Sequence, residues 1–542
     1  MISLNEYVKQ LYNQSSADNL LPFPTEERNK YYQTGNRQDF EKLYFRRRDF
    51  LSSCAFLALS DESFIPQLER IIIAVCDEYC WALPAHTSGI KEDDEKTIDL
   101  FAAETSFTLA EINTVFEDKL SSDTKCRIKI EIEKRLVKNY KEHKFWWETC
   151  RMNWASVCGA FTGGTLIYLF PEEFENQKTR ILETLRCYID GFSDDGTCME
   201  GAEYWLYGFS SFTYFADLLF RYSHGKTDLF DNIKVKKTAG YIERIFLKGN
   251  TVVSFSDADI NTKADIALQY YLSKKLPGYV NLLPESRMSI RDGNTKWPCL
   301  YRTAVWKDER KTENESLKNY IGKDQIIIHK DGYSLAFKGG NNDEPHNHND
   351  LGSFIFADED GQVLCDLGAG RYSKDYFSEK RYGVFCNSSS GHSVPIINSK
   401  EQGTGEKYTV NCKYESDVIT ADITGAYDEE KLKSFQRTLI CRDKSVLLID
   451  KAELYDKISV IDRFITLRKP VIRENEVVLG DTHILFDNHK VSLKINEYSH
   501  LPHGYDAEEI TVYCLDFTFN DNEVIFELCS SDDRKIRKII NC

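Results

Sequence analysis

The residues best able to do chemistry in this 542-residue chain are histidines that cluster in its second half. The sequence EPHNHND carries His346 and His348, and NSSSGHSVPIIN carries His392. Side chains two residues apart project from one face of an extended segment, so we expect His346 and His348 to share a site. Together with Asp366, the last residue of the predicted strand GQVLCD, two imidazoles and a carboxylate could hold Zn²⁺. The alternative is that each His is an ordinary hydrogen-bonded loop residue.

A second set of candidate residues lies in the first half, in FWWETCRMNWASVCGA and DDGTCMEGAEYWLYGFS. Asn153 has Trp154 beside it, a setting suited to sugar stacking next to an amide that forms hydrogen bonds. In the second segment, the pairs DG and EG interrupt the helical pattern, so Tyr204, Trp205 and Tyr207 are expected to line a cleft where the next helix begins. Aromatic residues at helical spacing also form ordinary cores, and this segment alone does not identify a site.

The elements that must position these residues change type along the chain. All seven Trp lie at or before Trp306, and the segments before it space apolar residues at three and four, the helical period. Beyond about Lys323 the chain consists of short β-branched or aromatic runs between turn residues, a pattern typical of antiparallel sheets. We therefore expect a helical domain over residues 1–315 and an antiparallel β-sandwich over residues 316–542.

Taken together, these segments resemble the heparinase II/III-like polysaccharide lyases. The resemblance consists of Asn-Trp, then DG...EG..YW.YG about fifty residues later, then HNHNDLGSF, and finally SS..HS.P.IN, and it spans about residues 70 to 400. It implies an incomplete α/α toroid followed by an antiparallel β-sandwich. It also implies an enzyme that cleaves uronic-acid-containing glycans by β-elimination, a carbon–oxygen lyase.

The resemblance also implies catalytic roles. Asn153 would bind the uronate carboxylate and stabilise the enolate-like intermediate. Tyr207 would donate a proton to the leaving O4 and, for one C5 epimer, would also remove the C5 proton. His346 would be the alternative base on the opposite face of the sugar. Tyr204, three residues before Tyr207, is a rival for the catalytic phenol because both can face the cleft on a helix.

The remaining site residues follow from the same resemblance. His348, Asp366 and His392 match the family's metal ligands, so a structural Zn²⁺ is expected there that fixes the loop carrying His346.

Four further residues are predicted to contact substrate: Arg371, Tyr382, Trp154 and Trp205. An Arg guanidinium can pair with a carboxylate or sulfate through two parallel hydrogen bonds.

Composition limits the partners. With 69 Lys+Arg against 86 Asp+Glu, the formal charge of −17 offers no broad footprint for nucleic acid or an anionic membrane. No apolar run reaches the ~18 residues of a membrane helix. The N-terminal MISLNEYVKQLYNQSS lacks the apolar core of a signal peptide, and sixteen cysteines then favour a reducing cytoplasm.

The expected partner is an anionic oligo- or polysaccharide containing uronic acid. Glycosaminoglycan-type chains come first and alginate-type chains second, and the protein could form a homo-oligomer. Two alternatives stay open. One is a carbohydrate-binding protein on the same fold without a working base, and the other is a zinc hydrolase that activates water at the metal.

Overall fold

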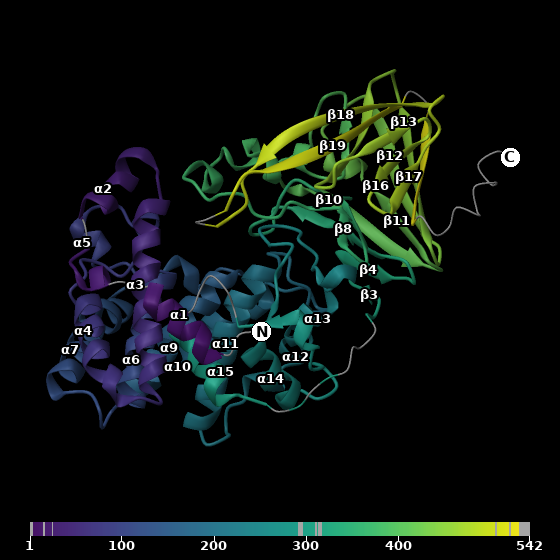
Figure 1. The fold of residues 1–542 in the computed structure, drawn as a ribbon. Helices are drawn as coiled ribbons and strands as arrows, with labels where there is room; N and C mark the ends of the chain where they lie inside the picture. Colours follow the sequence, from purple (N-terminus) through teal and green to yellow (C-terminus); the bar gives the residue numbers. More distant parts are fainter. Residues whose placement is uncertain are drawn as a thin grey trace. The chain divides into compact units, whose positions relative to one another are not determined.

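Helices dominate the first part of the chain and strands the second in the computed structural model (Figure 1). This order confirms the predicted fold class, a helical part followed by antiparallel sheets. Among the described residues, no helix has both the length and the apolar character needed to cross a membrane. The structure describes residues 4–14, 17–23, 25–290, 296–308, 310, 312, 317–504, 507–519 and 522–530.

The chain forms two compact units. Unit 1 comprises Met1–Phe192, Tyr204–Gly240 and Lys263–Glu313, and unit 2 comprises Ser193–Glu203, Tyr241–Thr262 and Asn314–Cys542. The chain therefore enters unit 2 twice, at 193–203 and 241–262, before its C-terminal strands begin. These two early segments carry Glu200 and Asp257 into the unit that holds the histidines. Domain limits at 1–315 and 316–542 remain a prediction.

The helices have the following bounds: α1 (Leu4–Gln14), α2 (Thr25–Thr34), α3 (Gln38–Ala58), α4 (Ile65–Cys76), α5 (Lys91–Asp94), α6 (Leu100–Val115), α7 (Ser122–Ile132), α8 (Lys138–Glu142), α9 (Asn153–Leu169), α10 (Pro171–Asp190), α11 (Ala202–Tyr222), α12 (Ile233–Ala239), α13 (Tyr241–Arg244), α14 (Ile266–Lys275) and α15 (Trp297–Val305). Two local signals show why they begin where they do. The Asp99 carboxylate accepts hydrogen bonds from two backbone N–H groups of α6, and Pro171 stands at the start of α10.

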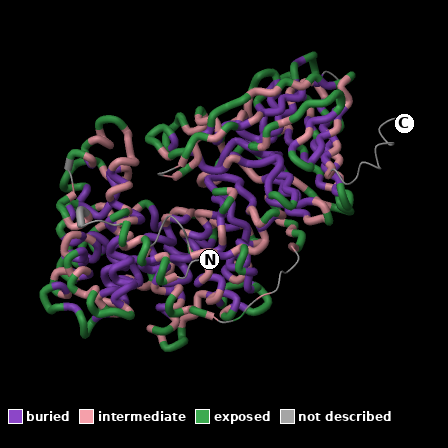
Figure 2. Tube along the Cα trace, viewed as in Figure 1, coloured by how far each residue is buried: buried purple, intermediate pink, exposed green. Residues whose placement is uncertain are grey.

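Helix α9 packs against α6 and α10, and its glycines let neighbouring helices approach closely. A Cβ at Gly163 would lie 2.6 Å from the ring of Phe215 on α11, and one at Gly159 would lie 3.0 Å from Thr184 on α10. Such spacing leaves α9 buried along nearly its whole length (Figure 2). Its first residue, Asn153, is held at a defined place as a result.

The strands have the following bounds: β1 (Ala264–Asp265), β2 (Met288–Ser289), β3 (Tyr320–Ile321), β4 (Gln325–His329), β5 (Ser334–Lys338), β6 (Gly340–Asn342), β7 (Phe354–Asp358), β8 (Gly361–Leu364), β9 (Pro395–Ile397), β10 (Gly405–Glu415), β11 (Val418–Asp422), β12 (Leu432–Cys441), β13 (Ser445–Leu454), β14 (Val460–Thr466), β15 (Val471–Arg473), β16 (Glu476–Leu479), β17 (Thr482–Leu485), β18 (Val491–His500), β19 (Ile510–Phe519) and β20 (Glu523–Ser530).

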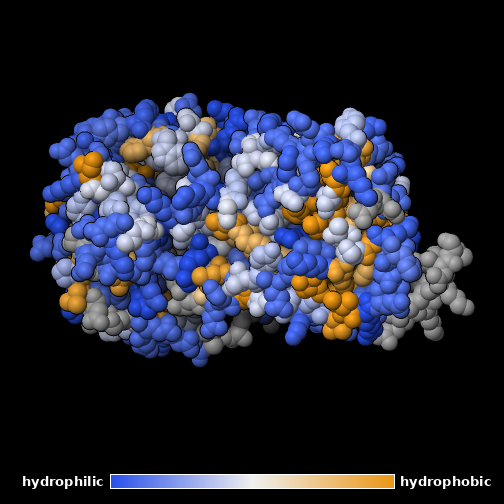
Figure 3. Space-filling view, turned by 90° about the horizontal axis from the view of Figure 1, so that it is seen from above, coloured by the Kyte–Doolittle hydropathy of each residue, from blue (hydrophilic) through white to orange (hydrophobic). Residues whose placement is uncertain are grey.

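The described strands of unit 2 form three sheets, with the strand orders β15-β16-β17-β20-β13-β12-β11-β10-β6, β18-β19-β14-β9 and β3-β4-β5-β7-β8. Each contributes to one aromatic core. The ring of Phe464 on β14 lies 5.4 Å from Phe354 on β7 and 5.0 Å from Phe526 on β20. Burial alternates along strands such as β12, so one face packs inward and the other meets solvent. Polar side chains dominate the molecular face shown in Figure 3.

We predict that Gly163→Leu lowers the free energy of unfolding by about 3 kcal/mol, because the added side chain overpacks the contact with Phe215. Thermal denaturation measures the loss. Gly383→Leu is the matched control, since a Cβ at Gly383 meets nothing within 4 Å. Equal melting temperatures for both variants would contradict the close approach of α9 and α11.

Candidate functional site

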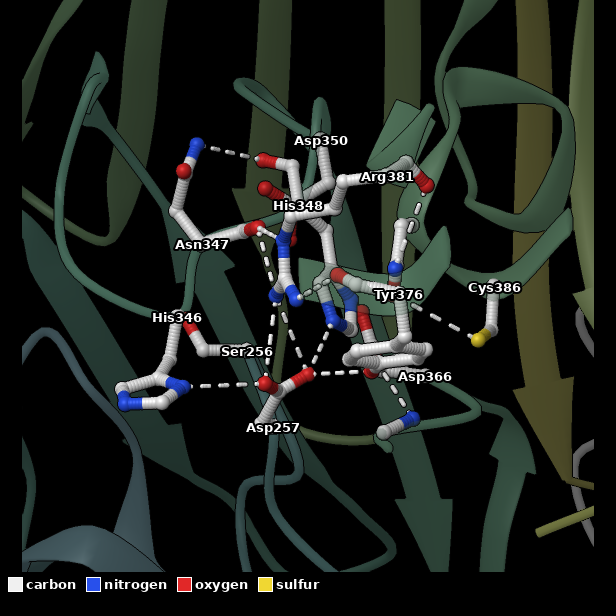
Figure 4. A network of polar contacts seen from close by, with 12 residues as sticks. Ser256, Asp257, His346, Asn347, His348, Asp350, Asp366, Tyr376, Arg381 and Cys386 are labelled. Atoms are coloured by element: carbon white, nitrogen blue, oxygen red, sulfur yellow. Dashed lines mark hydrogen bonds and ion pairs between the residues drawn. The ribbon is translucent and has the colours of Figure 1, made fainter. Parts of the chain in front are cut away.

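Asp257 is the centre of a buried polar cluster in unit 2 (Figure 4). Its Oδ2 lies 3.1 Å from His346 Nδ1, and its Oδ1 lies 2.9 Å from His348 Nε2. The Arg381 guanidinium donates to both carboxylate oxygens, and the Tyr376 hydroxyl donates to Oδ1. Burial opposes ionisation of Asp257, but Arg381 and the two imidazoles outweigh it, so its pKa lies well below the usual range. Asp257 is therefore an anion that orients both histidines.

His346 lies in a turn rather than in the extended segment that the HxH spacing suggested, and its φ of 60° is in the left-handed region. His346 and His348 still reach one site because both bind Asp257. An ionised Asp257 accepts the Nδ1 proton of His346, which leaves the Nε2 lone pair as the proton acceptor. Burial lowers the pKa of His346, and Asp257 offsets this only in part. Such a neutral imidazole oriented by a carboxylate is suited to act as a general base.

Three buried side chains could hold a metal ion: His348, Asp366 and His392 offer ligand atoms that all lie within 4.8 Å of one another. His348 uses Nε2 on Asp257, and its buried Nδ1 has no hydrogen-bond partner among the described residues. A ring whose second nitrogen is held by a carboxylate is the usual state of a metal-bound histidine. This orphaned nitrogen shows that the residues fit a bound cation.

The His392 ring supports the same conclusion. Its Nδ1 lies 2.9 Å from Asp366 Oδ2, and its Nε2 lies 2.8 Å from the Cys386 carbonyl oxygen, so both nitrogens face acceptors. Burial disfavours a charged ring, but Asp366 outweighs it and the pKa of His392 is raised. The pocket around Asp366 is therefore built for a positive charge, either a proton on His392 or a metal ion that His392 binds. Two imidazoles and a carboxylate are ligands that zinc accepts.

The predicted substrate contacts of unit 2 lie in the loops after β8. Tyr382 donates a 2.9 Å hydrogen bond to the side-chain oxygen of Asn347, which stands between His346 and His348 in the sequence. Arg371 is exposed, and its backbone N–H donates to the Leu501 carbonyl oxygen.

Tyr207 on α11 has a second polar cluster around it, within unit 1. Its hydroxyl donates to Glu104 Oε2 at 3.1 Å, and the Lys296 ammonium forms an ion pair with the same oxygen. The ammonium also lies 4.2 Å from the centre of the Tyr207 ring. Burial and then Glu104 raise the pKa of Tyr207 well above its ordinary value. Tyr207 therefore keeps its proton, which suits a general acid rather than a base.

The other candidates of unit 1 differ in exposure. Asn153 is fully buried at the start of α9, whereas Trp154 and Tyr204 are partly exposed. Trp205 is 0% exposed, and its indole N–H donates to the Thr238 carbonyl oxygen. Its ring also stacks on that of Phe209 at 5.2 Å, so both its polar atom and its ring are used within the helical unit. Trp205 supports helix packing, and the substrate site proposed below does not include it.

Sequence reasoning missed Asp257, Glu104, Lys296 and Tyr376. None belongs to a motif, and each reaches its cluster through contacts with residues 89 or more positions away. Asp257, in the segment SFSDAD, has no spacing to the histidines that would mark it as their partner. Only a fold that returns 241–262 to unit 2 shows its role.

Comparison with known proteins identifies the fold. No family model matches the sequence, and no curated protein matches it significantly. The match to a heparinase III structure covers 98% of this chain and 86% of the heparinase chain, with a TM-score of 0.60 at 14% identity. The match to the heparan sulfate lyase HepC from Pedobacter heparinus covers 97% of this chain and 87% of the HepC chain, with a TM-score of 0.60 at 15% identity. The match to the Streptomyces coelicolor A3 chondroitin AC lyase in complex with chondroitin sulphate covers 98% of this chain and 80% of the lyase chain, with a TM-score of 0.54 at 10% identity.

The sequence identities are low, so this likeness concerns the fold. It agrees with the resemblance read from the Asn-Trp, YW.YG and HNHND motifs, and it covers almost the whole chain. The chain has the fold of the heparinase-like polysaccharide lyases.

Proposed function

We propose that this protein is a polysaccharide lyase that cleaves uronic-acid-containing glycans by β-elimination. The observation that carries the proposal is the complementary proton states of His346 and Tyr207 on this fold. Asp257 orients a neutral His346 as a proton acceptor, and Glu104 holds Tyr207 as a proton donor. Elimination needs one group of each kind.

The proposed reaction removes the proton from C5 of a uronic acid unit and breaks the bond from C4 to O4. The C5 proton passes to Nε2 of His346, and its electron pair forms the C4–C5 double bond. Asn153 binds the neighbouring carboxylate, where negative charge builds up in the enolate-like intermediate. Tyr207 gives its proton to the departing O4. The raised pKa of Tyr207 supports His346 as the base over Tyr207 itself. Tyr204 stays the rival phenol.

A Zn²⁺ ion held by His348, Asp366 and His392 is part of the proposal. When bound, it would offset the charge of Asp366 and fix the His348 ring. His348 shares Asp257 with His346, so a fixed His348 helps Asp257 to orient the proposed base.

Glycosaminoglycan-type chains are the proposed substrates, with alginate-type chains second. The similar structures include a heparan sulfate lyase and a chondroitin AC lyase. Arg371, Tyr382 and Trp154 are proposed to contact the chain. A cytoplasmic location is also proposed.

The alternative functions predict different products. A carbohydrate-binding protein on this fold would release no product, and a zinc hydrolase would release products without a double bond. An absorbance screen of uronate polysaccharides therefore distinguishes them, because the C4–C5 double bond of a lyase product absorbs ultraviolet light.

We expect Tyr207→Phe to lower kcat by about 10²- to 10⁴-fold, since the leaving O4 loses its proton donor. Asn153→Ala should lower kcat by about 10²-fold, because the developing anion loses a hydrogen bond. The rate of increase in ultraviolet absorbance measures both. Tyr279→Phe, at an exposed position of unit 1, is the control and should leave kcat unchanged. Full activity in both site variants would remove this assignment.

Glu104→Gln should move the alkaline limb of the kcat profile to lower pH. An acid works only while protonated, so the rate falls as pH rises through the pKa of Tyr207. Burial and Glu104 hold that pKa well above its ordinary value, and the substitution removes the charge that raises it. Profiles from neutral to strongly alkaline pH test this, with Glu172→Gln as control. An unshifted limb in Glu104→Gln would contradict the proposed acid.

Asp257→Asn should weaken zinc binding by about 10–100-fold, because the carboxylate that holds the His348 ring is lost. It should also lower kcat through loss of orientation at His346. Zinc content after dialysis against buffered zinc measures the first effect. Asp375→Asn is the control, since the Asp375 side chain is 60% exposed. Zinc affinity equal to that of the wild type would argue against His348 as a ligand.

A further inference from the structure

A cavity of about 500 Å³ lies within unit 1, beside the start of α9. Trp154 lines it, together with Trp146, His143, His86 and Lys96. These five residues are called the tryptophan pocket below. Its volume falls within the roughly 300–1,000 Å³ of sites that bind small ligands.

Two indole rings form the apolar surface of the pocket. Trp146 is 60% exposed, an unusual state for the largest apolar side chain. Its ring lies 4.8 Å from that of Trp154, and the ring of His86 lies 4.9 Å from that of Trp154. Exposed indole faces stack well on the C–H faces of sugar rings.

Several contacts hold the segment that carries Trp146 in place. The rings of Phe145 and Trp147 are stacked at 5.3 Å, and the Glu148 carboxylate accepts the Phe145 backbone N–H at 2.6 Å. Arg180 binds Glu148 and also donates to the backbone carbonyl oxygens of Tyr140 and His143. A preformed surface of this kind loses little entropy when a ligand binds.

Polar groups around the pocket are free to bind a ligand. From the part of the chain that the structure describes, no hydrogen bond reaches the indole nitrogens of Trp146 and Trp154, the His143 ring or the Lys96 ammonium. His86 engages Asp99 through Nδ1 at 2.7 Å, and no described residue bonds its Nε2.

These groups favour a ligand rich in oxygen acceptors. Two indole N–H groups and an ammonium are donors only. Of the two acidic residues that line the cavity, Asp99 is committed to backbone N–H groups at the start of α6, and Asp93 accepts from the Ser88 hydroxyl. The free donors thus match hydroxyl, carboxylate or sulfate oxygens.

We propose that the tryptophan pocket binds one pyranose unit of an anionic glycan, stacked on Trp146 and Trp154, with its acidic group facing Lys96. This proposal rests on the proposed function and deepens it. Trp154 directly follows Asn153, the proposed partner of the uronate carboxylate, so the proposal places the bound unit next to the sugar that reacts. The pocket then contributes affinity through a sugar unit other than the one whose C5 proton is removed.

The experiment measures binding without turnover, by calorimetry in the Tyr207→Phe background. Heparan sulfate and chondroitin sulfate tetrasaccharides are the probes. Adding Trp146→Ala should raise Kd by about tenfold for the tetrasaccharide that binds. Tyr279→Ala, which removes another exposed aromatic residue of unit 1, is the matched control and should leave Kd unchanged.

Lys96→Gln tests the acidic group. It should weaken binding of the sulfated tetrasaccharide and reduce the dependence of Kd on salt, whereas Lys91→Gln, at a side chain that is 72% exposed, should do neither. A Kd unchanged by both Trp146→Ala and Lys96→Gln overturns the proposal, as does the absence of saturable binding to the Tyr207→Phe parent.

Failure of the proposed function gives a different result. Binding that depends on Trp146, together with wild-type protein that releases no ultraviolet-absorbing product, would support the pocket and remove the lyase assignment. If the wild-type protein releases ultraviolet-absorbing product and Trp146→Ala binds as tightly as its parent, the lyase assignment stands and the pocket is overturned.

Discussion

A buried carboxylate held ionised by its neighbours is the interaction on which the site in unit 2 depends. The Asp257 carboxylate is buried away from water, and Arg381, the two imidazoles and the Tyr376 hydroxyl stabilise its charge. Because its two oxygens bind different histidines, it ties the proposed base His346 to the proposed metal ligand His348. A shift of either ring therefore changes the hydrogen bonding of the other through Asp257. The same network stabilises His346 in its left-handed backbone conformation.

In unit 1, a carboxylate keeps a proton on its neighbour instead of orienting a proton acceptor. Glu104 faces a phenol rather than an imidazole, so its charge keeps the Tyr207 proton in place. Lys296 balances that charge and lies over the ring. Each carboxylate stabilises the proton nearest to it. Asp257 holds the proton on Nδ1 of His346 and leaves Nε2 as an acceptor, whereas Glu104 holds the proton on the Tyr207 hydroxyl, which is then a donor. The proposed elimination depends on this difference.

The metal site and the fold make complementary contributions to the functional assignment. The likeness to heparinase III and the chondroitin AC lyase extends over nearly the whole chain at low identity, so the arrangement of elements is shared more fully than the residues are. The assignment of chemistry to this chain therefore depends on its own side chains. The orphaned Nδ1 of His348 and the two acceptors around His392 indicate a cation without reference to any other protein.

The sequence by itself determined the order of helices and strands, because apolar residues recur with a period of 3.6 in helices and of 2 in strands. It also indicated His348, Asp366 and His392, since HxH and a later Asp and His are rare together. Only the tertiary structure decided that Asp257 joins the histidines, that His346 sits in a turn, that Trp205 is core and that Glu104 holds the Tyr207 proton. Those facts depend on contacts between residues far apart in the chain, and local spacing carries no record of such contacts.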